Sequence, residues 1–454
     1  MASKKELVEG QAFSRRRLVT AFVSGAPGGR EVEPGKPLRA VVGGVVLSAV
    51  LVVGALAAGL LSPTLADGWD NNSLVIAKDT GARYVALNGT LYPVINTSSA
   101  RLLIPSGFKV VSADADKLTG SKRGTTVGII GAPDALPDPS ALLGSGWTSC
   151  TSRDRGVASH ISRTTTATAV ADRAVIAQVD TGTSTATYLV DNGYRYQIRP
   201  DLVDGVTRAL ALDAAPTYRV TAAWINLFSP GAQIAPFAVP GLGQSLAGVQ
   251  GLPGDAVVGS VVTTAGDRSR PYLLESGGRI APLTAFAATI YQSGLGGQPP
   301  ASITLDQPEF TKLAPGDDLA PATWPGVVPE PVDRTPCAML RAGHNGTAPT
   351  VALGTSSGDA PRDATAVTTV DPGAGALVRG IGAASLDSGP VFLVDQTGVA
   401  FPVEGSGNDN PIARLGYSDS DIVPVPATWT DLLASGPTLS VAAANTPVTS
   451  SAGG

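Results

Sequence analysis

The sequence has few charged and aromatic residues and very few cysteines and histidines. Of 454 residues, 15% are charged and 5% are aromatic, with two cysteines and two histidines. Residues 62–454 hold only four Glu and five Lys, the residues on which exposed helix surfaces usually depend. This part of the chain therefore favours short strands, turns and brief helices.

Glycine and proline are abundant instead, with 54 and 36 residues. Glycine does not recur at every third position, which excludes collagen, and so many helix breakers exclude a coiled coil. The chain is 43% hydrophobic with a net charge of −5, which argues against a wholly disordered chain. The length predicts about two to four domains.

Motifs that carry catalysis are missing. The one Gly-Lys pair, Gly35-Lys36, is followed by Pro37, so there is no P-loop, and no G-x-G-x-x-G occurs. Gly354–Gly358 fits G-x-S-x-G, but both histidines precede Ser356, whereas a hydrolase triad needs a later one. We therefore expect no catalytic residue, no bound cofactor and no resident metal. A pair of catalytic carboxylates is the alternative, because the 29 Asp offer many pairs and the sequence gives no geometry.

Charge is unevenly placed along the chain. Residues 1–39 hold eight basic and four acidic residues, a net charge of +4, while the remainder holds 24 basic and 33 acidic residues, a net charge of −9. Nucleic-acid binding needs a basic face, so an acidic bulk argues against that partner.

The basic head is followed by an apolar run. Residues 40–61 carry no charge, and as a helix they would extend ~33 Å, enough to cross a bilayer. A cleaved signal peptide fits poorly, because the head of 39 residues is too long. We expect a single transmembrane helix, with residues 1–39 in the cytoplasm and residues 62–454 outside it under the positive-inside rule.

The head itself contains a candidate helix. Ser3-x-x-Glu6 is a capping-box pattern, and apolar residues alternate with basic ones after it. The predicted helix is amphipathic and lies on the membrane or against a partner; a solvated basic tail is the alternative. Its candidate contact residues are Arg15, Arg16, Arg17, Leu18 and Phe22.

Cys150 and Cys337 both lie in the part expected outside the cytoplasm. In an oxidising compartment, two cysteines most simply form a disulfide. A metal site is the alternative, because His160 and His344 follow the two cysteines, although zinc ligands usually have tighter local spacing.

Four segments share the pattern of an apolar run, a glycine-containing turn and a second apolar run: 84–94, 188–198, 272–283 and 392–403. Asn88-Gly89 and Asn192-Gly193 are strong type I′ hairpin signals. Late prolines suggest a strand end or an edge. The signature residues are Tyr84, Gly89, Pro93, Tyr188, Gly193, Tyr272, Gly277, Pro282, Phe392, Gly398 and Pro402.

A second pattern surrounds Trp224 and Trp429, each placed four residues after a valine and seven before a glycine. It predicts a strand, a short helix and a glycine C-cap. Partial copies appear at Leu142–Gly146 and Pro321–Trp324.

The predicted fold is mixed α+β and β-rich, with four hairpin and short-helix repeats around a disulfide-stapled central domain and a pseudo-twofold relation between the halves. A chance resemblance among Gly- and Pro-rich segments is the alternative. The expected boundaries are the head 1–39, the transmembrane helix 40–61, repeat units 62–125, 186–245, 246–318 and 381–454 (with the C-terminal tail), and central parts 126–185 and 319–380.

The order of these parts resembles the EccB family of the actinobacterial type VII (ESX) secretion system. The resemblance rests on Ser14–Phe22 (SRRRLVTAF), one anchor, four exterior repeats and a single cysteine pair. It implies an inner-membrane complex with EccC (the motor ATPase), EccD, EccE and the mycosin protease, and homo-oligomers formed through the periplasmic domain.

The resemblance leaves three functions open. A structural subunit whose periplasmic repeats assemble around an export conduit is favoured. The family's repeats are likened to a phage-lysin cell-wall-binding module, so a peptidoglycan-binding anchor is the alternative. Some members carry an ATPase label, which the missing P-loop makes the weakest part of the inheritance.

Overall fold

The computed structural model describes residues 4–24, 37–60, 67–105, 107–343, 347–358, 360–362, 364–382 and 385–448. The chain divides into two units, Met1–Asp67 and Gly68–Gly454, which are considered separately. Ser3 of the predicted capping box, residues 25–36 of the head and His344 lie outside the described residues.

The first unit contains helix α1 (Lys4–Ser24) and helix α2 (Pro37–Leu60). Helix α2 covers most of the apolar run at 40–61, yet none of the helices in the described residues is both long enough and apolar enough to cross a membrane. The structure therefore does not support the predicted transmembrane helix.

The described part of the second unit holds four sheets that share one strand order. In each, three consecutive strands form an antiparallel meander, a fourth strand pairs in parallel with the first, and a fifth pairs in parallel with the third. The orders are β4-β1-β2-β3-β5, β12-β9-β10-β11-β13, β17-β14-β15-β16-β18 and β26-β23-β24-β25-β27. We call them the first, second, third and fourth sheets; the expected repeat boundaries stay predictions.

The strands of the first two sheets are short. Those of the first sheet are β1 (Ser73–Ala77), β2 (Arg83–Leu87), β3 (Thr90–Pro93), β4 (Lys109–Ala113) and β5 (Lys122–Arg123). Those of the second are β9 (Arg173–Asp180), β10 (Thr185–Asp191), β11 (Tyr194–Gln197), β12 (Thr217–Arg219) and β13 (Ser229–Pro230), and β19 (Glu330–Pro331) also pairs with β9.

The strands of the other two sheets have similar lengths. Those of the third are β14 (Val261–Thr264), β15 (Asp267–Leu274), β16 (Arg279–Pro282), β17 (Ile303–Leu305) and β18 (Ala314–Pro315). Those of the fourth are β23 (Ala376–Ile381), β24 (Val391–Val394), β25 (Val399–Val403), β26 (Val423–Pro426) and β27 (Ala434–Ser435).

Helices occupy matching places in the four sheets. After the third strand come α3 (Thr97–Leu103), η3 (Pro200–Leu202) with α4 (Val203–Ala209), α6 (Ala285–Gln292) and α8 (Pro411–Leu415). Before the fifth strand come η1 (Ala115–Leu118), α5 (Ala222–Ile225), α7 (Gln307–Phe310) and α9 (Ala427–Thr430). The remaining helices are η2 (Pro139–Ala141), η4 (Ser276–Gly278), η5 (Gly407–Asp409), η6 (Asp419–Asp421) and α10 (Val441–Ala444).

The four predicted hairpins form at β2–β3, β10–β11, β15–β16 and β24–β25. Both residues of the Asn-Gly turns have positive φ, 49° and 74° at Asn88-Gly89 and 41° and 84° at Asn192-Gly193, as a type I′ turn requires.

The aromatic and proline residues of the hairpin signature face each other across the strands. Tyr84 pairs with Pro93, and Phe392 pairs with Pro402; Tyr272 likewise pairs with Pro282. In the second hairpin Tyr188 pairs with Gln197, where the other hairpins have proline.

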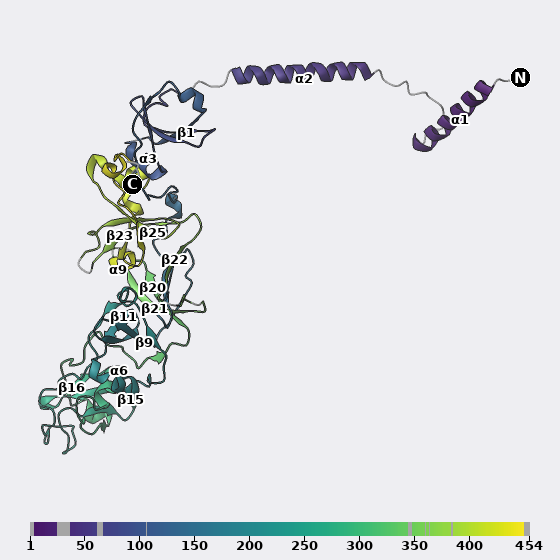
Figure 1. Ribbon diagram of the computed structural model, residues 1–454. Coiled ribbons are helices and arrows are strands. Elements are labelled where there is room, and N and C mark those ends of the chain that lie inside the picture. The colour runs from purple at the N-terminus through teal and green to yellow at the C-terminus, as the bar shows by residue number, and fades with distance from the viewer. Residues whose placement is uncertain are drawn as a thin grey trace. The chain divides into compact units, whose positions relative to one another are not determined.

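A fifth sheet has the order β22-β7-β6-β20-β21-β8 and joins the segments on either side of the second and third sheets. Its strands are β6 (Trp147–Thr151), β7 (Val157–Ile161), β8 (Thr168–Ala169), β20 (Thr335–Arg341), β21 (Thr350–Ser356) and β22 (Ala366–Val370). We call it the central sheet. Figure 1 shows β20, β21 and β22 between the labelled strands of the second and fourth sheets.

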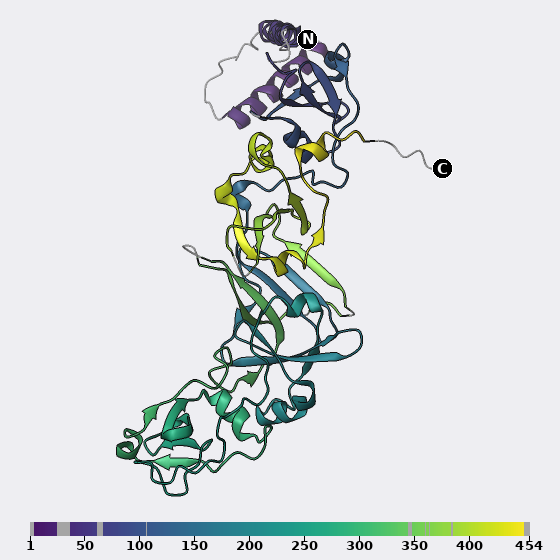
Figure 2. The ribbon, with the colours of Figure 1, turned by 90° about the vertical axis from the view of Figure 1, so that its left-hand side faces the viewer.

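Shared cores of buried side chains tie the five sheets together. The first and fourth sheets share one core, which includes Leu74 and Phe401. The second and third share another, which includes Leu189 and Phe286. A third core joins the central sheet to the second and fourth sheets, as Trp147 shows. Figure 2 shows the same neighbours: the yellow C-terminal strands lie beside the blue first sheet.

The tryptophan motif forms as a strand and a short helix, but its glycine has another role than predicted. Helices α5 and α9 end on Asn226 and Asp431, whereas Gly231 and Gly436 follow the fifth strands β13 and β27. The partial copies at Leu142–Gly146 and Pro321–Trp324 do not occupy the matching place, which η1 and α7 fill.

Each of the four sheets has a glycine directly after its fifth strand. Their backbone N–H groups donate to carbonyl oxygens of the third strand: Gly124 to Leu91 (2.9 Å), Gly231 to Arg195 (2.9 Å), Gly316 to Ile280 (2.7 Å) and Gly436 to Ala400 (2.8 Å). A Cβ on Gly436 would overlap the ring of Phe401, and one on Gly231 would overlap that of Tyr196. Glycine is needed here because a ring lies against the backbone.

We expect Gly436→Ala to lower the free energy of unfolding by about 1–3 kcal/mol, because the added methyl group overpacks against Phe401. Gly382→Ala is the matched control, since a Cβ there meets no atom within 4 Å. Urea unfolding followed by tryptophan fluorescence measures both; equal midpoints for the two variants would contradict this account.

Candidate functional site: the central sheet and its neighbours

The central sheet is fastened by the disulfide between Cys150 on β6 and Cys337 on β20. The two residues are direct partners in the antiparallel register, with Cα atoms 3.9 Å apart, and are separated by 187 residues in sequence. The disulfide is present as the sequence predicted, and its sulfurs lie among Ala167, Met339 and Ala352 in a small apolar cluster.

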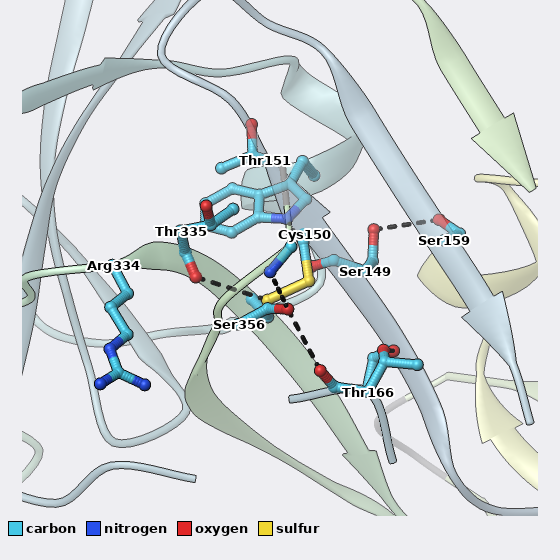
Figure 3. The surroundings of a disulfide bond; sticks show 12 residues. Ser149, Cys150, Thr151, Ser159, Thr166, Arg334, Thr335 and Ser356 are labelled. Carbon is cyan, nitrogen blue, oxygen red and sulfur yellow. Dashed lines mark hydrogen bonds between the residues drawn. A yellow bond between two sulfur atoms is a disulfide. The ribbon is translucent and has the colours of Figure 1, made fainter. Parts of the chain in front are cut away.

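Serine hydroxyl groups lie around the disulfide and form hydrogen bonds within the central sheet. Ser159 lies 3.1 Å from Ser149, and the hydroxyl of Ser356 donates to the carbonyl of Thr166 at 3.2 Å. Figure 3 shows these contacts on either side of the yellow bond. Both contacts join neighbouring segments of the sheet, and the buried contact between Ser149 and Ser159 satisfies hydroxyl groups that would be costly to bury alone.

The metal alternative finds no support in the described residues, which contain no cluster of three or more ligating side chains. Both cysteines are in the disulfide, so neither is free to bind a metal. The ring Nδ1 of His160 lies 2.6 Å from the hydroxyl of Thr369 on β22.

The central sheet exchanges strands between its two halves. Strand β8 follows β7 in sequence but pairs with β21, and β22 follows β21 but pairs with β7. Strands β6 and β20 pair in the middle. Each half therefore completes the sheet of the other, and neither half contains the whole arrangement.

Two tryptophans place the second and fourth sheets against the central sheet. The indole N–H of Trp224 donates to the carbonyl of Ser149 at 2.9 Å. Trp429 packs edge-on against Trp147, with ring centroids 6.3 Å apart. The repeated tryptophan is thus a docking residue of each flanking sheet.

A reciprocal pair of arginines joins the first and fourth sheets. Arg101 on α3 donates to the carbonyl of Leu415 at 3.0 Å, and Arg414 on α8 donates to the carbonyl of Leu102 at 2.8 Å. Each guanidinium thus meets the C-terminal carbonyls of the other helix, where a positive charge is favourable. The tripeptide Ala-Arg-Leu occurs at both places in the sequence, and this repeat is the pattern from which the pair could be predicted.

Acidic residues begin three of the hairpin turns, and each has a different environment. Asp395 accepts hydrogen bonds from the N–H and hydroxyl of Thr397 and from the N–H of Val399. Glu275 pairs with Arg279 at 3.0 Å. Burial, together with the negative charge of Asp172, raises the pKa of Asp191 to about 6.

The predicted contact residues of the head lie on α1. Leu18 is 67% exposed and Phe22 is 90% exposed. Arg15 lies three and seven residues before them, and so on the same helix face. Basic and apolar side chains are therefore mixed on that face, and the predicted amphipathic separation is incomplete.

We expect replacement of both cysteines by serine to lower the free energy of unfolding by about 2–5 kcal/mol, because the disulfide restricts the unfolded chain between them. Urea unfolding of the oxidised protein and of the double variant measures the difference. Native protein that has been denatured, reduced and refolded under reducing conditions should have the same urea midpoint as the double variant. If neither the reduced protein nor the variant has a lower midpoint than the oxidised protein, the stabilising role is contradicted.

Asp191→Asn should raise the free energy of unfolding at pH 7 by about 1–3 kcal/mol and leave it unchanged near pH 4. The raised pKa of Asp191 means that the folded state holds an extra proton between pH 4 and 6, so its stability falls as pH rises through that window.

The matched control is Asp395→Asn at the same hairpin position. It should lower stability at pH 7, because the three hydrogen bonds that Asp395 Oδ1 accepts are strengthened by the carboxylate charge, which Asn lacks. Urea midpoints at pH 4 and pH 7 decide, and a pH-independent effect at Asp191 would overturn the assignment.

Comparison with known proteins bears on the whole chain. The ESX-1 secretion system ATPase EccB1 of Mycolicibacterium smegmatis (strain MKD8) is 29% identical over 440 residues, 89% of this chain and 87% of that protein. The solved EccB3 dimer from the ESX-3 core complex matches with a TM-score of 0.67 at 24% identity, over 82% of this chain and 99% of that chain.

A second solved structure, the intact ESX-5 inner membrane complex, matches with a TM-score of 0.63 at 24% identity, over 99% of this chain and 96% of that chain. These likenesses show that the fold is the EccB fold. The family model described as "Type VII secretion system ESX-1, transport TM domain B" matches residues 1–450. The chain therefore belongs to the EccB family of type VII secretion proteins.

Proposed function

We propose that this chain is a structural subunit of a type VII (ESX) secretion membrane complex. The family match over residues 1–450 carries the proposal. The similar solved structures, an intact ESX-5 inner membrane complex and an EccB3 dimer, support assembly into a complex that contains more than one EccB copy.

The two units have different roles in the proposed complex. Residues 1–61 attach the chain to the membrane part of the complex, supported by the uncharged run at 40–61 and by the membrane domain in the family's description. Residues 68–454 lie in the periplasm and assemble around the export conduit. The motor ATPase EccC, EccD, EccE and the mycosin protease are the proposed partners.

The exterior unit has the construction that a scaffold needs. We propose that its four similar sheets are repeats in two pairs, related by a pseudo-twofold axis at the Cys150–Cys337 disulfide. The shared strand order and the exchanged strands β8 and β22 support this arrangement. Paired cores and a cross-link far apart in sequence favour a rigid body over a hinged one.

An ATP-hydrolysing subunit is the second candidate, because the similar EccB1 protein carries ATPase in its name. The sequence has no P-loop to hold the β- and γ-phosphates. The structural role therefore accounts better for the residues that are present.

We expect a tagged full-length chain, extracted in mild detergent from its native host, to co-purify with the ESX motor ATPase and further ESX membrane components. The amount of these partners recovered with a chain lacking residues 1–39 should be at least tenfold lower, because the proposed attachment lies in the first unit. Mass spectrometry of the purified material measures both.

The outcome is sharpened by two controls. The chain lacking residues 1–39 should keep the urea midpoint of its exterior unit, which shows that a lower recovery of partners does not result from unfolding. Purified full-length chain should turn over no more ATP than a heat-denatured sample. Undiminished secretion after deletion of residues 68–454 would contradict the structural role, and ATP turnover would favour the second candidate.

A further inference from the structure

The four sheets differ in how they protect the outer edge formed by their fourth strands. An unpaired edge presents N–H and C=O groups on which another strand can pair, and proteins usually shorten, cover or interrupt such edges. The fourth strands are β4, β12, β17 and β26.

The edge of β12 is covered by an extended piece of the chain itself. The N–H of Arg219 donates to the carbonyl of Arg153 at 3.0 Å, and the N–H of Arg155 donates to the carbonyl of Arg219 at 2.8 Å. Asp154 and Arg219 form a parallel bridge. The next residue, Val220, turns inward and donates to Gln178, so Arg219 faces outward.

The edge of β26 is blunted by proline. Strand β26 reads Val-Pro-Val-Pro, with Pro424 and Pro426. Proline has no N–H to offer and is tolerated where a strand's N–H would face away from the sheet. Val220 and Val425 are the valines four residues before the repeated tryptophans, and the residues that precede them, Arg219 and Pro424, therefore occupy corresponding places.

Strand β4 has neither form of protection. The carbonyl of Ala113 accepts from the N–H of Lys78, so Ala113 faces the sheet, and Ser112, one residue earlier, faces outward because inward and outward groups alternate. Ser112 therefore corresponds to Arg219 and Pro424. Both Ser112 and Val110 are exposed, Val110 by 54%.

Strand β4 is also longer than the third sheet's edge. It has five residues without proline, whereas β17 has three. No backbone hydrogen bond at the outer side of β4 is found among the described residues. The first sheet therefore keeps the longest open edge of the four.

We propose that the outer edge of β4 is a docking site for an extended, acidic segment of another subunit of the secretion complex. This rests on the proposed function, because it places that subunit beside the first sheet. The covered edge of β12 shows how such a segment is held: in parallel, by two hydrogen bonds to the outward-facing residue.

Charge favours a different chain over a second copy of this one. Residues 68–125 hold seven basic and four acidic residues, a net charge of +3, and Lys109 begins β4. Pairing of β4 with its own copy would bring two such units together, which repulsion disfavours. An acidic segment with an apolar residue opposite Val110 complements both the charge and the exposed valine.

Ser112→Pro in the full-length chain tests this edge, with Ser112→Ala as the matched control. Proline removes the outward N–H, and the fourth sheet already accommodates Pro424 at the corresponding place. Loss of that hydrogen bond should reduce co-purification of the bound subunit about five- to tenfold, while alanine keeps the N–H and should change it less than twofold.

A photo-crosslinking amino acid at Val110, used in cells, identifies the occupant. An adduct with an acidic segment of another ESX subunit supports the proposal. An adduct with a second copy of this chain, no adduct, or equal partner recovery for Ser112→Pro and Ser112→Ala would overturn it. Urea midpoints of both variants show that the sheet is intact.

These results separate the two proposals. If the tagged native chain co-purifies with no ESX component, the proposed function fails. If it does co-purify but Ser112→Pro retains every subunit at native levels, the complex stands and only the β4 edge is excluded.

Discussion

The pairing of β6 with β20 is the constraint on which the exterior unit depends. These strands are separated by the whole of the second and third sheets, yet they lie side by side with Cys150 opposite Cys337. The chain passes through the central sheet on its way to the third sheet and again on its return. One disulfide therefore closes a large loop and fixes both passages, at a place where the sheet's hydroxyl groups are already satisfied.

From this pairing the rest of the arrangement follows by contact. The central sheet receives one tryptophan from each of the sheets that flank it, Trp224 and Trp429. The fourth sheet in turn holds the first, through a shared core and the crossed contacts of Arg101 and Arg414. Each contact uses a residue at a matching place in a similar sheet, so one local design serves several interfaces. The outer edge of β4 differs from the corresponding edges of the second and fourth sheets, because neither a covering segment among the described residues nor a proline protects it.

Sequence patterns predicted the local structures well and their roles less well. The hairpins were readable because Asn-Gly turns and alternating apolar runs act over a few residues. The glycines at 231 and 436 were assigned to helix caps, whereas they lie against aromatic rings that the chain supplies from another strand. The membrane span expected at 40–61 is not supported among the described helices. The paired arginines were missed because a three-residue repeat gains meaning only when two helices meet.

The sequence by itself determined the β-rich class, the four hairpins and the partner of each cysteine, because composition, turn preferences and the count of two cysteines are local or elementary facts. Only the tertiary structure decided that the first sheet packs on the fourth and the second on the third, that β8 and β22 are exchanged, and that Asp191 is buried beside Asp172. The physical reason is that packing and burial arise between segments far apart in the chain. No window of residues contains both sides of such a contact.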